Sequence, residues 1–541
     1  MAKKNQQAKK SFISTYRIQL LVIGLLVLLL YSRTVKFEFV GLDDKTLILD
    51  NYKFIKDLGN IKAAFVNDVF YNPQAPGGSR AYYRPIMTLS LMFDSQLSGQ
   101  SPKFYHLINI LFHLICSLLL FRFFILLRLS SETSFAGTVL FAVHPVLSQA
   151  IGWIPGRNDS LLTMFILASL IFFIQFLETK NKSKLRFHIL FFALALFSKE
   201  TAVFLPVLCI LYYRSIFKSQ EPSVKNNFLK SNTKSLTIGY LLVLLPWFLL
   251  RKSVIATTTA DLSFAHLSSS FIENMPIYLQ IVQKIIAPYN LSIMSIAKDT
   301  NFIVSSVLIA AIIVLLILSK QKRWNYILFG FAWFNVFLLP AFVVPILTGF
   351  EHRAYLPLIG FLLIVFEVDY FKNLDYKKIH SFIVIAIVAI AFCIINYNHT
   401  PAFSNKFSFW EKAAANSPHS SLAKLNYGAA LAEQGKTDEA VKVYRDGLII
   451  NYSEPMIHNN LGAIYAQRLL YADAEKEFKE ENRVNPTYSD AFYNLGVVYE
   501  KMGRETEMIA SWEKALSINS NHPLARKALD KYYRKKNGTL N

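Results

Sequence analysis

Cysteine is scarce in this sequence. Only three cysteines occur in 541 residues, Cys116, Cys209 and Cys393, and each lies inside an apolar run. Three isolated cysteines provide no disulfide framework, and their separation lacks the short spacings of a cysteine-based metal site. A disulfide-stabilised fold and a cysteine-based metal site are therefore excluded. The cysteines do not indicate whether the protein lies in an oxidising or a reducing compartment.

Charged residues are nearly absent from the long apolar runs. The chain is 53% hydrophobic, which is more than a soluble protein of this size normally carries. The surplus predicts helices that face lipid, because a chain in hydrocarbon must satisfy its backbone hydrogen bonds internally. A transporter would place ionisable residues at mid-membrane in broken helices, so the missing charges argue against that class.

Basic residues are in excess, with a formal net charge of +21. Such a charge can indicate nucleic-acid binding. Here the basic residues gather between the apolar runs, as expected of loops beside a membrane. We therefore expect a lipid bilayer, and no nucleic acid, as the charged partner.

Eleven apolar runs are predicted to be transmembrane helices. Several are shorter than the roughly 20 residues that a perpendicular span needs, so their ends are approximate. The first run has no small-residue cleavage site after it, which predicts a retained anchor instead of a removed signal peptide. The predicted spans are 17–32, 106–127, 134–151, 160–177, 186–199, 201–217, 236–250, 302–319, 325–347, 354–371 and 379–396.

Lys and Arg clusters set the expected orientation. Clusters such as 180–186 and 320–323 fall on one side of the predicted membrane, together with the N-terminus. Because cytoplasmic loops are rich in Lys and Arg, this side is predicted to be the cytoplasm. An odd number of spans then places 33–105, 251–301 and everything after about 397 on the opposite side. We favour a bacterial inner membrane from the Lys- and Asn-rich composition, with the endoplasmic reticulum membrane as the eukaryotic alternative.

A repeat occupies the C-terminal part of the chain. The triplets Asn426-Tyr-Gly428, Asn460-Leu-Gly462 and Asn494-Leu-Gly496 recur every 34 residues, which is the period of tetratricopeptide repeats. About three repeats and a basic capping helix near 523–535 are expected. Such arrays bind peptide segments in a groove, so recruitment of a protein partner is the predicted role, and simple tethering is the alternative.

The predicted organisation is therefore all-α and has two domains. Residues 1–400 are predicted to form a polytopic membrane domain. Residues 401–541 are predicted to form a short tetratricopeptide repeat solenoid.

Ionisable residues gather at the predicted outer ends of the spans. Charges near a membrane interface are costly and usually have a reason, so these residues are candidates for a functional site. The short outer turns carry balanced charges, Arg157 with Asp159, Lys199 with Glu200, and Glu351 with Arg353, and Lys199 and Glu200 are expected to form an ion pair. The candidates are Asp43, Asp44, Arg84, His106, Asn109, His144, Arg157, Asp159, Lys199, Glu200, Glu351 and Arg353.

Two of these groups have more than one interpretation. Asp43 and Asp44 can supply a general base or bind a cation, or one of them can cap a helix. His106, Asn109 and His113 share one helix face, which suits either a metal or a stripe of interhelical hydrogen bonds.

Arg353, at the outer end of the predicted span 354–371, also has two interpretations. Arg353 can hold a phosphate with two parallel hydrogen bonds. It can equally extend its side chain to the lipid headgroups.

Taken together, these motifs resemble a known family. The sequence is similar to the transmembrane and tetratricopeptide-repeat-containing O-mannosyltransferases and their bacterial relatives, within the C-type multispanning glycosyltransferases. The motifs that carry the resemblance, in chain order, are Asp43-Asp44, Tyr83-Arg84-Pro85, His106-Leu-Ile-Asn109 with His113, Phe141-Ala-Val-His-Pro145, Gly156-Arg-Asn-Asp159, Ser198-Lys-Glu200 and Arg353-Ala-Tyr-Leu-Pro357.

The resemblance implies an inverting hexosyltransferase that moves a mannose-like sugar from a polyprenyl-phosphate donor to a protein hydroxyl. One of Asp43 and Asp44 would be the general base, and Arg353, Arg84 and Lys199 would bind the donor phosphate. The other candidates would support the site. No metal is expected, although a divalent cation is possible. The alternative function is a non-catalytic membrane scaffold whose repeats bind partner proteins.

Overall fold

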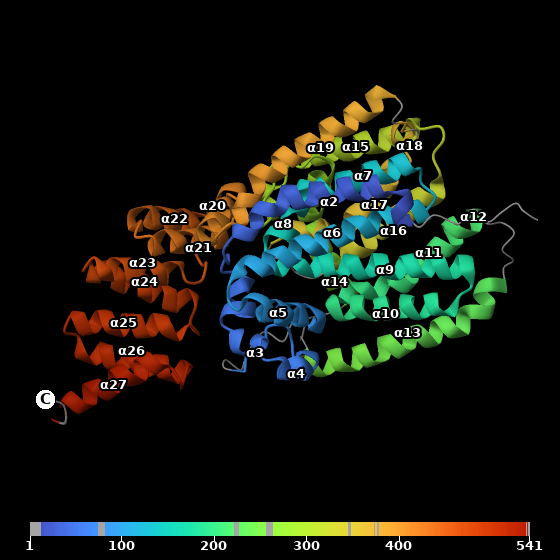
Figure 1. Cartoon of the computed structure of the whole chain (residues 1–541). Coiled ribbons are helices and arrows are strands. Elements are labelled where there is room, and N and C mark those ends of the chain that lie inside the picture. Colours follow the sequence, from blue (N-terminus) through green and yellow to red (C-terminus); the bar gives the residue numbers. More distant parts are fainter. Residues whose placement is uncertain are drawn as a thin grey trace, which may run out of the picture. The chain divides into compact units, whose positions relative to one another are not determined.

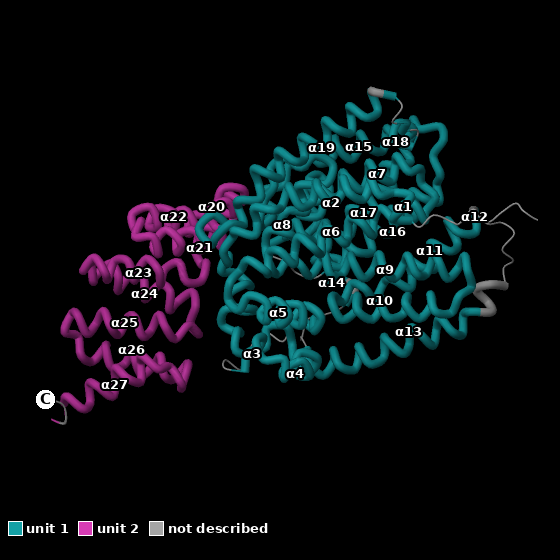
Figure 2. The backbone as a smooth tube through the Cα atoms, viewed as in Figure 1, with its two compact units in different colours: residues 1–409 teal, residues 410–541 magenta. Residues whose placement is uncertain are grey.

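The computed structural model describes residues 12–73, 82–220, 227–255, 263–343, 348–372, 374–375, 378–536 and 538. These residues form helices, and within them no strand occurs apart from an isolated bridge between Ser295 and Gly349. The predicted all-α fold class is confirmed. The chain divides into two compact units, residues 1–409 and 410–541 (Figure 2), whereas the sequence placed the division after residue 400.

Unit 1 contains helices α1 to α19 and the start of α20 (Figure 1). Its α-helices are α1 (Phe12–Thr15), α2 (Arg17–Tyr31), α3 (Tyr52–Lys56), α4 (Ile61–Val66), α5 (Pro85–Ser98), α6 (Pro102–Leu126), α7 (Ser131–Val143), α8 (Ser148–Gly152), α9 (Arg157–Thr179), α10 (Lys182–Ser198), α11 (Leu205–Tyr212), α12 (Lys218–Gln220), α13 (Asn227–Val254), α14 (Phe264–Ile286), α15 (Phe302–Leu318), α16 (Trp324–Leu338), α17 (Pro357–Val365), α18 (Asp369–Lys372), α19 (Ile379–His399) and α20 (Lys406–Asn416). Short 3-10 or π turns join them at η1 (Ser32–Lys36), η2 (Lys45–Leu49), η3 (Leu58–Asn60), η4 (Pro145–Leu147), η5 (Ile154–Gly156), η6 (Glu200–Phe204), η7 (Tyr213–Phe217), η8 (Ala297–Asp299), η9 (Leu339–Ala341), η10 (Glu351–Ala354) and η11 (Thr400–Phe403).

Seven helices in the described part of the chain are long and apolar enough to cross a membrane. A bent pair, α7 followed by Pro145–Gly152, turns by 49° and is an eighth candidate. The seven are Arg17–Lys36, Pro102–Leu126, Ile154–Thr179, Glu200–Phe217, Asn232–Val254, Trp324–Ala341 and His380–Phe403.

The predicted count of eleven spans is only partly matched. Each predicted span falls on a helix, but three of these helices are short. Helices α10 and α15 have 17 residues each, and α17 has 9. The remaining spans therefore stay a prediction, as does the orientation that depends on an odd number.

The predicted outer loop at 251–301 contains a long helix, α14. Ile277, Ile281 and Ile285 are buried along one side of it, at a spacing of four residues, which is one helix face. Ser263 caps its start by accepting a hydrogen bond from the His266 amide at 3.3 Å. The sequence reading missed this helix because its apolar face alternates with polar residues and forms no continuous run.

Helix α9 lies at the centre of unit 1, packed against both α6 and α10 (Figure 1). Small polar side chains contact backbone carbonyl groups across both of these interfaces. Ser169 Oγ donates to the His188 carbonyl of α10 at 2.8 Å, and the Cys116 thiol of α6 contacts the Ser160 carbonyl at 3.1 Å. The middle of α9 is thereby joined to α10, and its first turn to α6.

After the end of α20, the described part of unit 2 contains three helical hairpins and one further helix. The predicted tetratricopeptide fold of this part is confirmed, because helices pair within each 34-residue repeat. The helices are α21 (Ser421–Glu433), α22 (Thr437–Ile450), α23 (Ile457–Gln467), α24 (Tyr471–Val484), α25 (Ser489–Lys501), α26 (Glu505–Ile518) and α27 (Pro523–Lys536).

The glycine of each repeat triplet meets an aromatic ring of the second helix. A Cβ atom on Gly428 would lie 2.5 Å from Tyr444, and one on Gly496 would lie 2.4 Å from Trp512. Gly462 meets Phe478 in the same way at 3.0 Å. The 34-residue recurrence of glycine thus reflects the closest approach of the two helices in each hairpin.

Candidate active site

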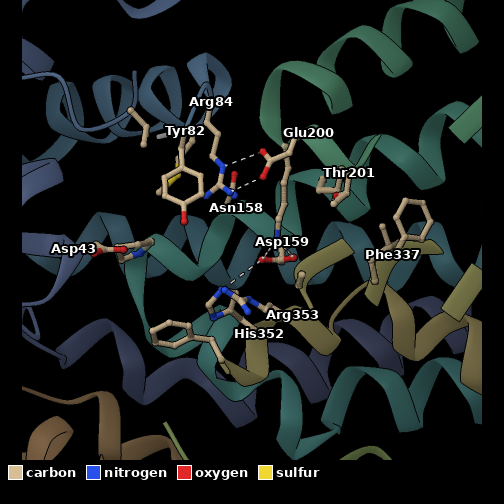
Figure 3. A pocket seen from close by; sticks show the side chains of 18 of the residues that line it. Asp43, Tyr82, Arg84, Asn158, Asp159, Glu200, Thr201, Phe337, His352 and Arg353 are labelled. Atoms are coloured by element: carbon tan, nitrogen blue, oxygen red, sulfur yellow. Dashed lines mark hydrogen bonds and ion pairs between the residues drawn. The ribbon is translucent and has the colours of Figure 1, made fainter. Parts of the chain in front are cut away.

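Charged residues that are widely separated in the sequence line one cavity of about 350 Å³ in unit 1 (Figure 3). Figure 3 shows Asp43 and Phe337 toward opposite sides of the view, with Arg84, Asp159, His352 and Arg353 between them. The polar lining residues are Asp43, Tyr82, Arg84, Asn158, Asp159, Lys199, Glu200, Thr201, His352 and Arg353. The cavity therefore brings together six of the twelve residues that the sequence singled out.

The two acidic residues of the first loop face different environments. Asp43 lines the cavity. Asp44 is 1% exposed, and its Oδ2 accepts a hydrogen bond from the Val40 amide at 2.8 Å. The loop can close in this way because Gly41 adopts a φ of +84°, which glycine tolerates best. Asp44 makes no side-chain capping hydrogen bond, so the structure does not support the capping interpretation for it.

Burial raises the pKa of both carboxyl groups. The pKa of Asp44 rises to about 7; the Val40 hydrogen bond opposes this rise, and the neighbouring charge of Asp43 adds to it. The pKa of Asp43 also rises, but the positive charge of Arg84 counteracts the effect of burial. Arg84 thus favours the ionised form of Asp43. The corresponding effect of Arg157 on Asp44 is the smallest of the influences on its pKa.

Arg84 is held by several partners before the start of α5. Its Nη2 donates to Glu200 Oε1 at 3.1 Å, and its Nε lies 3.5 Å from Oε2. The Tyr82 ring stacks 4.4 Å from the guanidinium carbon. With its amide oriented to satisfy both ends, Asn158 accepts from Arg84 Nη1 at 3.1 Å and donates to the Ser198 carbonyl at 2.8 Å.

Lys199 and Asp159 form a second ion pair across the cavity wall. Lys199 Nζ lies 2.8 and 3.0 Å from the two oxygens of Asp159. Asp159 lies in the first turn of α9, which begins directly after Gly156. A Cβ atom on Gly156 would lie 2.7 Å from the Gln149 carbonyl oxygen. The glycine allows the start of α9 to approach α8 closely, and this places Asp159 at the cavity.

The predicted ion pair between Lys199 and Glu200 is wrong, and the other balanced charges of the outer turns also pair elsewhere. Lys199 pairs with Asp159 and Glu200 pairs with Arg84, although Lys199 and Glu200 are neighbours in sequence. Arg157 pairs with Asp94 instead of Asp159, and Glu351 pairs with Lys284 instead of Arg353. Each charge finds its partner on another element, because side chains of neighbouring residues at a turn point in different directions.

Arg353 lines the cavity and keeps hydrogen-bonding capacity free. Its Nη1 atom is buried and has no hydrogen-bond partner among the described residues. Its guanidinium carbon lies 5.8 Å from the Phe350 ring centre, and the charges of Asp159 and Glu200 attract it. The side chain is turned into the cavity, so the structure does not favour the headgroup interpretation. A buried guanidinium with an unused N–H is suited to an anionic ligand.

Arg157 lies behind the cavity. Its side chain is fully buried, forms an ion pair with the equally buried Asp94, and donates to the Tyr105 carbonyl at 2.8 Å. It therefore joins α9 to α5 and α6. The structure assigns it to packing, and it does not line the cavity.

The polar residues of α6 also serve packing. Asn109 donates to the Ile151 and Trp153 carbonyls, both at 3.2 Å. His113 uses both ring nitrogens, toward Tyr355 Oη at 2.5 Å and the Ala142 carbonyl at 2.9 Å. The interpretation of interhelical hydrogen bonds is confirmed for these two residues. His106 is buried and packs edge-on against Phe37 at 5.9 Å.

Two further candidates fix the segments around the cavity. His144 Nε2 lies 3.0 Å from the Ile285 carbonyl, and its Nδ1 accepts from the Val146 amide at 3.3 Å. Glu351 pairs with Lys284 at 2.8 Å and accepts from the Ser292 amide at 2.6 Å. Both residues therefore attach the region of α14 to the rest of unit 1. Among the described residues, no group of three or more His, Cys, Asp or Glu side chains is placed to hold a metal ion.

Sequence reasoning assigned no role to several lining residues. Tyr82, Asn158 and His352 line the cavity, and each lies within two residues of a candidate in the same motif. Trp153 lines it as well, and only its position just before the Gly156 motif hinted at this. The motifs marked the right segments but not the individual residues, because the tertiary fold decides which side chains of a segment face the cavity.

Comparisons with known proteins agree with the motifs. Residues 85–249 match the family model for dolichyl-phosphate-mannose-protein mannosyltransferase, and residues 489–522 match that for the tetratricopeptide repeat. The first match contains Asp159, Lys199 and Glu200, whereas Asp43, Arg84 and Arg353 lie outside it.

Similar proteins include several that are named protein O-mannosyl-transferases. The chain is 26% identical to protein O-mannosyl-transferase F38B6.6 of Caenorhabditis elegans over 459 residues, covering 80% of this chain and 63% of that protein. It is 29% identical to human protein O-mannosyl-transferase TMTC3 over 31% of this chain and 19% of that protein. Against mouse TMTC2 it is 32% identical over 30% of this chain and 19% of that protein. The chain thus spans less than two thirds of each relative, and its resemblance to O-mannosyltransferases is confirmed.

Proposed function

We propose that this chain, which resembles the O-mannosyltransferases, is a membrane glycosyltransferase. It moves a mannose-like hexose from a polyprenyl-phosphate donor to a hydroxyl group of a protein acceptor. The mannosyltransferase match over residues 85–249 and the names of the relatives support this reaction class.

The observation that carries the proposal is a carboxylate that belongs to neither ion pair of the cavity, that of Asp43, in the same cavity as a group of cations. Asp43 lies in the same cavity as Arg84, Lys199 and Arg353. A glycosyl transfer from a phosphate ester needs a base for the incoming hydroxyl and positive charge for the departing phosphate. Few purely structural arrangements require both in one enclosed space.

In the proposed reaction, Asp43 accepts the proton of the acceptor hydroxyl while the hydroxyl oxygen attacks the anomeric carbon. The bond between that carbon and the phosphate oxygen breaks on the opposite face, so the configuration inverts. Polyprenyl phosphate leaves with the bonding electron pair. Asp44 is outside the cavity with one oxygen engaged, so we propose Asp43, and not Asp44, as the base.

Arg353 is proposed as the direct phosphate ligand. Its Nη1 atom is the buried guanidinium donor of the cavity wall that has no described partner. Arg84 and Lys199 already pair with Glu200 and Asp159, so they contribute charge at longer range. A divalent cation shared by Asp43 and the phosphate is the alternative; transfer that a chelator stops and Mg²⁺ restores would establish it.

We further propose that the reaction takes place on the non-cytoplasmic face, with the N-terminus in the cytoplasm. The repeats of unit 2 would recruit the protein acceptor there. The distribution of Lys and Arg supports this orientation. A bacterial inner membrane is the favoured location, and the endoplasmic reticulum membrane applies if the source is eukaryotic.

A second candidate is a non-catalytic membrane scaffold whose repeats bind partner proteins. It is favoured by one observation: Arg84 with Glu200 and Lys199 with Asp159 neutralise each other inside the cavity. Such pairs are also found where charges only stabilise a fold. A scaffold, however, does not explain Asp43 and the unpaired donor of Arg353.

The test is transfer of radiolabelled sugar from a panel of polyprenyl-phosphate donors to membrane proteins. Cells carrying the wild-type chain, Asp43→Asn and Asp44→Asn are compared, with Asp50→Asn as a matched control because Asp50 is exposed and belongs to the same loop. We expect Asp43→Asn to abolish labelling and the control to retain it. Full labelling with Asp43→Asn, or none in the wild type with any donor, would favour the scaffold.

A further inference from the structure

The His352 imidazole is fixed by a single glutamine. The Gln149 Oε1 atom accepts from the His352 backbone amide at 3.0 Å and lies 3.1 Å from the His352 Nδ1 atom. Gln149 itself is fully buried in α8. One oxygen therefore holds both the backbone and the ring of His352.

The orientation of the Gln149 amide determines where the imidazole carries its proton. Gln149 Nε2 donates to the Ile293 carbonyl at 3.0 Å, so the amide nitrogen is committed and the oxygen must face His352. An amide oxygen only accepts hydrogen bonds, and Nδ1 must therefore be protonated. In the neutral ring, Nε2 then has a free lone pair.

The surrounding charges keep the ring neutral. Burial lowers the pKa of His352 well below its usual range, and the positive charges of Lys199, Arg353 and Arg84 lower it further. The nearest acid, Asp159, lies 3.8 Å from Nε2 and is already bound by Lys199. His352 therefore offers a hydrogen-bond acceptor in a cavity that is otherwise rich in donors.

Two aromatic rings stand next to this acceptor. Trp153 and Phe350 stack at 5.9 Å with an interplanar angle of 22°, and Trp153 lies 5.5 Å from the His352 ring. All three line the cavity. Trp153 is 4% exposed, and its Nε1 atom is buried without a hydrogen-bond partner among the described residues. The wall thus combines an apolar face with one free donor and one free acceptor.

We propose that Trp153, Phe350 and His352 form the subsite for the hexose of the donor, with His352 Nε2 accepting a hydrogen bond from a sugar hydroxyl. A pyranose has apolar C–H faces and a rim of hydroxyl groups, which this combination matches. The sugar is bonded directly to the phosphate, and Arg353 follows His352 in the chain. The inference rests on the proposed function, because it assumes that Arg353 binds the donor phosphate.

The experiment measures binding of two kinds of probe to the full chain in detergent micelles. Farnesyl phosphate contains the phosphate alone, and farnesyl phosphates carrying mannose, glucose or N-acetylglucosamine add the sugar. We expect His352→Phe to weaken binding of the preferred sugar-linked probe roughly tenfold, the typical effect of losing one such hydrogen bond. Binding of farnesyl phosphate should be unchanged. His352→Gln should restore most of the affinity, since an amide oxygen can replace the Nε2 acceptor.

Each outcome separates the subsite from the phosphate clamp. An unchanged affinity of His352→Phe for every sugar-linked probe overturns the subsite while leaving the proposed function intact. Arg353→Ala should weaken both probes, and wild-type protein that binds neither probe overturns both ideas. As an independent measurement, ¹⁵N-histidine NMR, with the His352 signal identified by its loss in His352→Phe, should show protonation at Nδ1. A proton at Nε2 contradicts the inference.

Discussion

Ion pairs in the two units of this chain follow different rules. In unit 2 several pairs join residues of one helix or of adjacent turns, such as Glu475 with Lys479 and Glu480 with Arg483, and the basic side chain of each of these two pairs is largely exposed. In unit 1 the three pairs at the cavity and directly behind it join residues 40, 63 and 116 positions apart, and Arg157 with Asp94 is completely buried. The first kind can be read from helical spacing, whereas the second depends on the tertiary fold.

The two kinds of pair also differ in what their loss should cost. Exposed pairs contribute about 0–1 kcal/mol because water and salt screen them. Removing one partner of a buried pair leaves an uncompensated charge and costs about 3–5 kcal/mol. The comparison therefore makes quantitative predictions for the two units.

The largest effect on stability is expected for Arg157→Ala. This change leaves the buried Asp94 without its partner and should lower the free energy of unfolding of unit 1 by about 3–5 kcal/mol. The measurement is thermal unfolding of the full chain in detergent. Lys479→Ala in unit 2 is the control and should cost less than about 1 kcal/mol. Equal effects of the two changes would mean that the distinction between the units is wrong.

Asp43→Asn should show the reverse pattern, with intact stability and lost activity. The carboxylate lies in the cavity and neutralises no buried partner directly, so unfolding should be nearly unchanged. Sugar transfer should fall by about 10²-fold or more if Asp43 is the general base. Activity and unfolding temperature are measured on the same preparation. A fall in stability that accounts for the lost activity would remove Asp43 from the proposed chemistry.

Asp44 should make the first loop sensitive to pH. Its pKa is about 7 in the folded chain and near 4 when unfolded, so the folded state prefers the protonated form. The stabilising contribution is therefore complete below about pH 4 and is lost as the pH rises through about 7. The free energy of unfolding, measured by denaturant titration of the full chain in detergent, should fall as the pH rises from about 4 to about 7 and change little above that. Asp44→Asn should remove this dependence, and an identical pH response in that variant would exclude Asp44 as its source.

The smallest effect concerns a local irregularity in unit 2. Gly435, Leu469 and Gly503 occupy equivalent turns at intervals of 34 residues, and all three have a positive φ, of +77°, +62° and +71°. A leucine is strained in this conformation, and Leu469 is 70% exposed. Leu469→Gly should stabilise unit 2 by about 0.5–1 kcal/mol. A rise of a few degrees in the unfolding temperature is expected, and destabilisation would show that Leu469 makes contacts that outweigh its strain.

The sequence predicted the elements of the fold better than the arrangement of the site. Apolar runs located helices at each of the eleven predicted spans, and the recurring glycines located the repeats. Helix α14 was missed because its apolar residues are interleaved with polar ones. Among the candidate residues, the motifs found Asp43, Arg84 and Arg353 but did not separate them from Asp44, Arg157 and Glu351, which lie outside the cavity.

Local periodicity is a property of the chain itself, so the sequence alone determined the helical class, the apolar character of unit 1 and the repeat of unit 2. Which charge faces which is a property of distances between elements. Only the tertiary structure decided that Lys199 binds Asp159, that Glu200 binds Arg84, and that Arg353 keeps a free donor in the cavity. The physical reason is that neighbouring residues in a turn point in different directions, and packing of α9 against α10 selects the partners that meet.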